Sequence, residues 1–266
     1  KSQIIDSISE FIDPYMNFEA YLQLAEVETL ELMISNTTEA GIVLDESDSI
    51  EATPPKTFPG KVLAFLLHRY RHFNGDLTKG LYIVPCELID NNGDELHRCV
   101  KRLAEVHHLE EGFMTWLDEA NTFTNTLVDR IVPGYPAKRI EEFTNQFGYL
   151  DKNMVLGEVF HLWVIEDRNG ISSVLKGAEA NLNILFVKDI KPYKIRKVRI
   201  LNGLHTLMVP VSYLYGIDTV GETMNDDLML TFLNHTVEDE MIPATERYLT
   251  ADELRQFAKE VYDRFN

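Results

Sequence analysis

Short apolar runs alternate with a helical pattern in the first part of the chain, and this alternation limits the possible folds more than any other feature. Residues 30–35 and 81–84 have the apolar character of buried strands, and residues 61–70 between them have helical periodicity. A strand, a helix and a second strand in succession are typical of the parallel sheet of an α/β domain. The alternation therefore predicts the second half of a doubly wound sheet.

Helical patterns dominate after the turn signal Asn92-Gly93. They cover residues 94–107, 111–119 and 138–147. The sequence Gly148-Tyr-Leu-Asp-Lys-Asn then precedes the start of a new element, and we place a domain boundary near residue 150. The chain has no apparent internal repeat or low-complexity segment.

A lysine, an asparagine and a histidine follow one another at the spacing K-x4-N-x2-H in the second part of the chain. Along an α-helix, Asn202 would lie roughly 140° and His205 roughly 80° around from Lys197, so one broad face could present all three side chains. Together they can deprotonate an alcohol and hold the resulting oxyanion without a metal. Pro192 stands where a proline can start a helix, and Pro210 where a helix would kink or stop.

The same stretch also has the pattern of an ordinary amphipathic helix, whose polar residues serve only to meet solvent. Its core face would be formed by Ile195, Val198, Leu201, Leu204 and Met208. Spacing alone does not separate the two interpretations.

Further motifs lie in order along almost the whole chain. They are Ser35-Asn-Thr-Thr-Glu-Ala-Gly41, Pro85-Cys-Glu-Leu-Ile-Asp-Asn-Asn-Gly93, Asn125-Thr-Leu-Val-Asp-Arg-Ile131, Trp163-Val-Ile-Glu166 and Asp218-Thr-Val-Gly-Glu-Thr-Met-Asn-Asp226. With the Lys197 segment, they resemble the polyol-specific long-chain dehydrogenases/reductases, the mannitol dehydrogenase family, whose members use this Lys, Asn and His as their reaction centre. Several motifs in order are more specific than any one of them.

The resemblance implies both a fold and an activity. The fold would be the C-terminal part of a Rossmann-like doubly wound α/β domain in residues 1–149, followed by a mainly α-helical substrate domain in residues 150–266. The activity would be NAD(H)-dependent, metal-independent oxidation and reduction of a sugar acid in hexuronate breakdown. Within the family, the chain is most similar to members that interconvert D-tagaturonate and D-altronate. Members acting on fructuronate/mannonate or on mannitol/fructose are the alternative.

The two ends of the chain indicate that it is a fragment of a longer protein. Family members begin with a Gly-rich dinucleotide-binding turn and continue beyond the helix pattern of residues 252–266. None of the 14 glycines forms a G-x-G-x-x-G or G-x4-G-K-[ST] motif. We therefore expect a chain truncated at both ends. An alternative of a different class follows: a noncatalytic fragment that lacks the site for the cofactor phosphates.

The resemblance assigns a role to each polar residue of the reaction centre. Lys197 would be the general acid/base, provided that burial or neighbouring positive charge lowers its pKa. Asn202 and Asn92 would donate hydrogen bonds to the developing oxyanion, and His205 would orient the sugar. Mannitol-oxidising members carry an acid three residues before the lysine. Lys194 stands there in this chain, which favours a carboxylated substrate.

Two further segments are candidates for ligand contact. Asn36, Thr37, Thr38 and Glu39 follow a predicted strand and would lie where open α/β sheets bind cofactors; a turn without a ligand is the alternative. Asp129 and Arg130 would contact the substrate or organise its pocket, or else form a structural salt bridge.

The charge of the chain excludes some partners. With 25 Lys and Arg against 43 Asp and Glu, the net charge of −18 makes nucleic acid an improbable partner. The only basic cluster, residues 188–199, could attract a sugar acid or simply be a solvated helix face. No apolar run is long enough for a membrane helix. The partner implied is a small-molecule sugar acid, and the oligomeric state is left open.

Cysteine and histidine usage predicts neither a disulfide framework nor a metal site. Cys86 and Cys99 are the only cysteines, and with no signal peptide apparent they favour a reducing, cytoplasmic setting. His68 and His72 have the i, i+4 spacing of zinc ligands, but no third ligand accompanies them in sequence, and two arginines lie between them. We therefore expect no metal.

Overall fold

The computed structural model describes residues 4–38 and 40–265. The chain forms two compact units. The first consists of Lys1–Val128 and Ile165–Lys188, and the second of Asp129–Val164 and Asp189–Asn266. The boundary expected near residue 150 falls inside the segment 129–164. As a division between a nucleotide-binding domain and a substrate domain, it stays a prediction.

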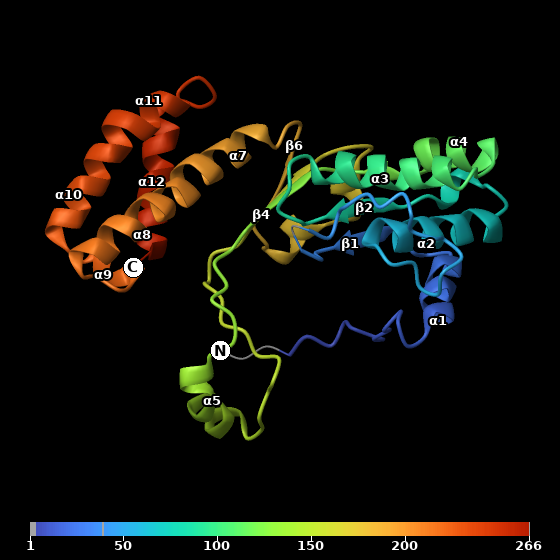
Figure 1. Cartoon of the computed structure of the whole chain (residues 1–266), viewed down its shortest axis with the longest axis horizontal. Coiled ribbons are helices and arrows are strands. Elements are labelled where there is room, and N and C mark those ends of the chain that lie inside the picture. The colour runs from blue at the N-terminus through green and yellow to red at the C-terminus, as the bar shows by residue number, and fades with distance from the viewer. Residues whose placement is uncertain (1–3, 39, 266) are drawn as a thin grey trace. The chain divides into compact units, whose positions relative to one another are not determined.

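The first unit contains a parallel three-stranded sheet in the order β1-β2-β3. Figure 1 labels the neighbouring strands β1 and β2. Its strands are β1 (Leu32–Ser35), β2 (Tyr82–Pro85) and β3 (Thr122–Phe123). In register, Leu32 faces Tyr82, and Tyr82 faces Thr122. The two strands and the intervening helix that the sequence predicts are therefore confirmed.

Three helices cover this sheet and share one hydrophobic core with it. They are α2 (Phe58–His72), α3 (Asn92–Val106) and α4 (Glu111–Ala120), each close to its predicted range. Thr57 caps α2, because its hydroxyl accepts a hydrogen bond from the Gly60 amide. The core includes the fully buried side chains of Leu63, Leu66, Leu96, Leu103, Phe113 and Trp116. This is the α/β arrangement that the sequence predicts for the N-terminal part of the chain.

The remaining elements outside the C-terminal helices are short. A second three-stranded sheet has the order β4-β5-β6. The bounds are α1 (Phe18–Gln23), η1 (Leu24–Glu26), η2 (Leu77–Lys79), β4 (Thr126–Asp129), η3 (Ala137–Arg139), α5 (Ile140–Phe147), β5 (Leu162–Glu166), α6 (Ile171–Val174), η4 (Gly177–Ala180) and β6 (Ile184–Val187).

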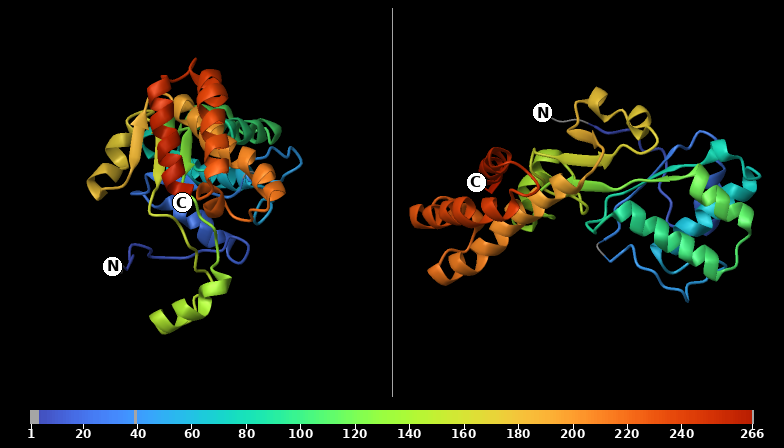
Figure 2. Two further views of the ribbon diagram at one scale, coloured as in Figure 1. Left: turned by 90° about the vertical axis from the view of Figure 1, so that its left-hand side faces the viewer. Right: turned by 90° about the horizontal axis from the view of Figure 1, so that it is seen from above.

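The second unit is mainly helical, as expected. Figure 2 shows its helices from α7 to α12 gathered into one bundle. They are α7 (Lys191–Arg196), the π-helix η5 (Lys197–Asn202), α8 (Gly203–Tyr215), α9 (Val220–Met224), α10 (Asp227–Thr236), the π-helix η6 (Val237–Met241), α11 (Ile242–Thr245) and α12 (Ala251–Phe265). Their common core contains Ile200, Leu204, Leu233, Leu254, Phe257 and Val261.

The two prolines of the Lys197 segment behave differently. Pro192 lies in the first turn of α7, as the sequence predicts. Pro210 does not stop α8, which continues to Tyr215, so of the predicted kink or stop, the stop is wrong. The carbonyl of Thr206, which would have bonded the missing N–H, belongs to an exposed residue, where water can satisfy it.

No helix in the described part of the chain is both long and apolar enough to cross a bilayer.

Candidate functional site

Lys197 lies at the start of a π-helix, between two α-helical segments. The sequence predicts an ordinary α-helix here, in which Asn202 would lie roughly 140° from Lys197. π-Helical hydrogen bonds instead join residue i to residue i+5, so residues five positions apart come nearly one turn apart, on the same side. Lys197 and Asn202 are five positions apart. The unusual winding therefore brings their backbone positions closer together than α-helical spacing does.

Asn202 and His205 are both exposed, whereas Lys197 is half-buried. The ring of His205 lies 6.3 Å from that of Phe265, measured between centroids, at an angle of 65°. Ile200, Leu201 and Leu204 carry the buried face of the same stretch. Of the core face predicted from the sequence, Leu201, Leu204 and Met208 are buried, whereas Val198 is exposed and Ile195 is half-buried, so that alternative is correct only in part. Asn202 and His205 are left open to a ligand.

A buried ion cluster is the main charged feature of the second unit. Arg264, in the last turn of α12, donates from Nη1 and Nη2 to the two carboxylate oxygens of Asp129 at 3.0 and 2.9 Å. Its Nη2 and Nε donate to Glu158 at 2.8 and 3.1 Å. The guanidinium also lies over the ring of Phe160, 4.2 Å from its centroid. The exposed fractions of these side chains are 7% for Arg264, 4% for Asp129 and 16% for Glu158.

Burial and the charges of this cluster both act on the pKa of Lys197. Burial, the largest effect, lowers the pKa of Lys197; Asp129 opposes this by raising it, and Arg264 lowers it further. The net result is a pKa below that of an ordinary lysine. A lysine of this kind can be present as the free amine at lower pH and so accept a proton.

Arg130 does not pair with Asp129, its neighbour in sequence. Nε and Nη2 of the exposed Arg130 side chain donate to the backbone carbonyl of Glu158 at 3.0 and 2.8 Å. The Glu158 carboxylate in turn accepts the Ile131 amide at 2.5 Å. These bonds hold residues 129–131 against Glu158. The expected substrate contact of Asp129 and Arg130 stays a prediction.

In the first unit, the residues expected to contact a cofactor follow β1. Asn36, Thr37 and Thr38 are exposed, whereas Glu39 lies outside the described residues. The buried carboxylate of Glu87 accepts the amide and hydroxyl of Thr37 at 2.9 and 2.8 Å and the hydroxyl of Ser35 at 3.1 Å. Glu87 therefore holds this loop at the carboxyl end of the parallel sheet, which is where such sheets bind cofactors.

Asn92, also in the first unit, is buried and hydrogen-bonded to backbone groups. Its Nδ2 donates to the carbonyls of Pro85, Glu87 and Thr126 at 2.9, 3.0 and 3.2 Å, and its Oδ1 accepts the Thr126 amide at 2.9 Å. A Cβ on Gly93 would overlap the backbone of Thr124, so only glycine fits beside it. These bonds give Asn92 a structural role, and its part in an oxyanion hole stays a prediction.

Sequence reasoning missed Arg264, Glu158 and Glu87. The sequence contained an indication for Arg264, because this arginine falls at helical spacing from Phe257 and Val261 on the otherwise apolar face of α12. A charge on a buried stripe usually has a buried partner. Glu158 stands in a stretch without regular periodicity and offered no such signal.

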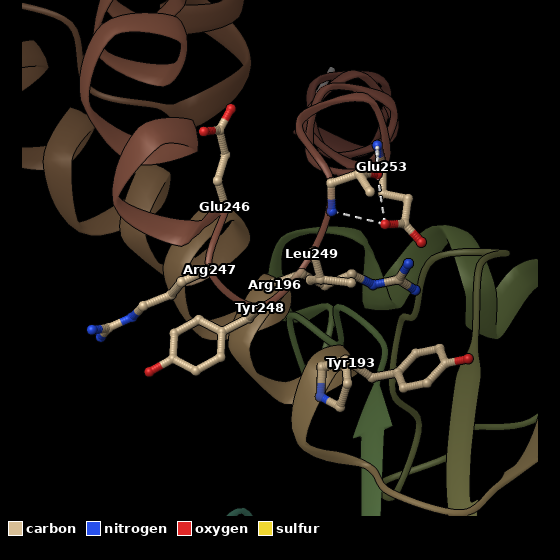
Figure 3. A pocket seen from close by; sticks show the side chains of 9 residues that line it. Tyr193, Arg196, Glu246, Arg247, Tyr248, Leu249 and Glu253 are labelled. Carbon is tan, nitrogen blue, oxygen red and sulfur yellow. Dashed lines mark hydrogen bonds between the residues drawn. The ribbon is translucent and has the colours of Figure 1, made fainter.

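The basic cluster of residues 188–199 contacts aromatic rings. Arg196 lies over Tyr193 and Phe257 at 5.0 and 4.6 Å from their centroids. Arg199 lies 5.4 Å from the ring centroid of Tyr248 and donates to a backbone carbonyl. Figure 3 shows Tyr193, Arg196 and Tyr248 around a pocket of about 580 Å³, together with Arg247 and Glu253. Lys197 does not line this pocket, and we place the candidate site at the ion cluster instead.

The histidines of α2 share a carboxylate from a distant segment. Glu26 lies 2.8 Å from Nε2 of His68 and 3.8 Å from Nδ1 of His72. The sequence shows no third ligand beside these histidines; in the fold, Glu26 lies near both because η1 packs against α2. The contact between Glu26 and His68 has the geometry of a hydrogen bond. Among the described residues, no group of three or more His, Cys, Asp or Glu side chains is arranged to hold a metal ion.

Two family models match the chain. The model described as the mannitol dehydrogenase Rossmann domain matches residues 2–176, and the model described as the mannitol dehydrogenase C-terminal domain matches residues 189–266. Altronate oxidoreductase from Bacillus subtilis (strain 168) is 49% identical over 262 residues, which is 98% of this chain and 54% of that protein. Altronate oxidoreductase from Yersinia pestis is 44% identical over 265 residues, which is 100% of this chain and 54% of that protein. The chain spans about half the length of the curated relatives it matches.

Solved structures show the same fold. Pseudomonas fluorescens mannitol 2-dehydrogenase, in a ternary complex with NAD and D-mannitol, matches with a TM-score of 0.73 and 24% identity, covering 98% of this chain and 54% of that one. A D-sorbitol dehydrogenase in substrate-free form matches with a TM-score of 0.75 and 22% identity, covering 94% and 52%.

Proposed function

Because this chain belongs to the mannitol dehydrogenase family, we propose that it carries the proton-transfer residue of an NAD(H)-dependent enzyme that interconverts D-tagaturonate and D-altronate. Relatives named altronate oxidoreductase, at 43 to 49% identity over nearly the whole chain, support this substrate pair. The observation that carries the proposal is Lys197, half-buried on a π-helix, with its pKa lowered beside Asp129 and Arg264.

Lys197 moves the proton of the reacting hydroxyl. In the oxidation of altronate, the free amine of Lys197 accepts the hydroxyl proton and becomes an ammonium group. In the reduction of tagaturonate, the ammonium group returns that proton to the alkoxide. Asn202 donates a hydrogen bond to the same oxygen as negative charge develops on it, and His205 holds a neighbouring hydroxyl.

The loop after β1 is the candidate site for binding the cofactor. NAD(H), when bound, accepts or supplies the hydride. Asn36 and Thr38 would contact it, because their polar side chains are exposed at the carboxyl end of a parallel sheet. Glu87 would keep this loop in place through Thr37.

The pH dependence of the two directions follows from the lowered pKa of Lys197. Altronate oxidation needs the free amine, so its rate should rise as pH increases through the pKa of Lys197, at a pH below the ordinary lysine range. Tagaturonate reduction needs the ammonium group, so its rate should fall through the same pKa. One shared pKa in the two opposite profiles would support Lys197 as the proton carrier.

The test uses the complete protein. NADH oxidation is measured with tagaturonate, fructuronate and fructose, for the wild type and for Lys197→Ala, with the exposed Lys191→Ala as matched control. We expect tagaturonate to be the best substrate, Lys197→Ala to lose at least about 100-fold in kcat, and Lys191→Ala to be unchanged. A preference for another sugar would replace the substrate pair, and a fully active Lys197→Ala would reject the mechanism.

The noncatalytic alternative has its own measurement. Calorimetric titration of the complete protein with NADH shows whether the cofactor binds at all. Saturable binding contradicts a protein that has lost its cofactor site. No binding, together with no turnover of any of the three sugars, contradicts the enzyme.

A further inference from the structure

Arg264 competes with Lys197 for one carboxylate. Both oxygens of the buried Asp129 accept hydrogen bonds from the Arg264 guanidinium, at 2.9 and 3.0 Å. Asp129 also acts electrostatically on Lys197. The helix that carries Arg264, α12, packs directly against η5, the helix that carries Lys197. Two cations from adjacent elements therefore share one buried anion.

The guanidinium is held in a single place by contacts on several sides. Glu158 takes two further hydrogen bonds from Arg264, and the ring of Phe160 covers its face. A planar guanidinium with two carboxylates and a ring around it has few other orientations. Glu158 is itself bonded to the Ile131 amide. The cation is thus anchored to the backbone that follows Asp129.

We propose that Arg264 is a positioning residue for Lys197: clamped by Glu158 and Phe160, it occupies the Asp129 carboxylate and places a fixed cation near the Lys197 amine. The inference deepens the proposed function and rests on it, since it says how the proton carrier is kept ready. The direction of the Lys197 pKa agrees, because Arg264 lowers it while Asp129 raises it. Without Arg264, Asp129 would be left to pair with Lys197 alone.

Two further charged groups on elements that pack against η5 have partners elsewhere. Glu238 of η6 accepts hydrogen bonds from Arg255, and Arg196 of α7 lies over Tyr193 and Phe257. Asp129 and Arg264 are the groups whose charge acts on the pKa of Lys197. The test therefore uses substitutions of Asp129 and Arg264.

The experiment measures the titration of Lys197 directly. The complete protein is pulse-labelled with acetic anhydride across a range of pH, and the labelling of the Lys197 peptide is quantified by mass spectrometry. Arg264→Gln should move the titration to higher pH, with about tenfold less labelling at a fixed pH below the plateau. Asp129→Asn should move it to lower pH. Arg264→Lys, which keeps a cation but loses the fork, should lie between the wild type and Arg264→Gln.

Two variants serve as controls. Arg255→Gln removes an exposed, ion-paired arginine from the same helix and should leave the titration unchanged. Glu158→Gln removes a negative charge from the clamp and should not move the titration to higher pH, although it weakens the anchor. If Arg264→Gln titrates like the wild type, or if Arg264→Gln and Asp129→Asn shift in the same direction, the inference is wrong.

Labelling separates this inference from the proposed function, because it needs no turnover. The pH–rate profile of altronate oxidation is recorded for the same variants. If the variants shift the labelling titration of Lys197 and shift the pH–rate profile in the same direction, both the inference about Arg264 and the proposed function are supported. If the labelling shifts while Lys197→Ala remains active, Arg264 positions Lys197 but Lys197 is not the proton carrier. If Arg264→Gln does not fold, the titrations of Arg264→Lys and Asp129→Asn decide whether the inference holds.

Discussion

At the scale of single residues, Arg69 shows how one buried cation can hold several loops. It is 1% exposed and donates to the backbone carbonyls of Lys79, Ala25, Val27 and Leu30 at 2.5 to 3.1 Å. Three of these carbonyls lie in the segment before β1, and that of Lys79 lies just before β2. Burial lowers the pKa of Arg69, but the four acceptors compensate for its desolvation.

Replacing Arg69 should therefore destabilise the first unit. Arg69→Met leaves four buried or partly buried carbonyls without their donor, and we expect a loss of about 3 kcal/mol or more in the free energy of unfolding. Arg69→Lys keeps the charge but cannot reach all four carbonyls. Its free energy of unfolding should therefore lie between those of Arg69→Met and the wild type. Urea unfolding followed by circular dichroism measures this. Arg71→Met, on the exposed side of the same helix, is the control; equal losses at the two positions would contradict the role of Arg69.

At the scale of elements, the π-helix η5 decides how the K-x4-N-x2-H residues face one another. A π turn holds about one residue more than an α turn, and π-helices are frequent at functional sites because they re-aim side chains. η5 joins α7 to α8 without a break in the helical run. Its buried side, Ile200 and Leu201, faces the bundle core, so core packing can hold the wider winding in place.

Inserting one alanine after the exposed Val198 should turn Lys197 by about 100° relative to Asn202 and His205, because each further residue of a helix rotates the chain by about that angle and the π turn already holds one extra residue. We expect kcat/KM of the complete protein with its proposed substrate, tagaturonate, to fall about 100-fold or more, with the helical content seen by circular dichroism preserved. Val198→Ala keeps the chain length and should retain activity. A fully active insertion variant would show that the orientation of Lys197 relative to Asn202 has no part in the reaction.

At the scale of the whole molecule, stability comes from two hydrophobic cores. One is formed by α2, α3, α4 and the parallel sheet, and the other by η5 to α12. No buried residue belongs to both clusters in the described part of the chain. The net charge of −18 adds repulsion across the surface, so the cores must also offset this term.

A cavity in either core should therefore loosen mainly its own unit. Leu103→Ala, in the first core, and Leu204→Ala, in the second, each remove a fully buried side chain and should cost about 2–5 kcal/mol. Hydrogen–deuterium exchange with mass spectrometry should show faster exchange first in peptides of the unit that carries the substitution. Identical exchange patterns from the two variants would mean that the chain unfolds as one cooperative body.

The sequence by itself determined the types of most elements and the candidate reaction centre. Apolar alternation and helical periodicity predicted β1, α2 and β2 correctly, because local patterns reflect which side of an element is buried. The resemblance of ordered motifs predicted the mannitol dehydrogenase family, and both family models match. The helix start at Pro192 also followed from local chemistry, because a proline fits the first turn of a helix.

Tertiary structure decided what local patterns do not contain. Periodicity predicted an α-helix at Lys197, and Pro210 predicted a kink or a stop, whereas packing against the bundle core supports a π-helix and an α8 that continues past Pro210. The pairing of Arg264 with Asp129 joins residues 135 positions apart, and no spacing rule predicts such a contact. Periodicity reports burial along one element, while ion pairs between elements depend on how the chain brings distant segments together.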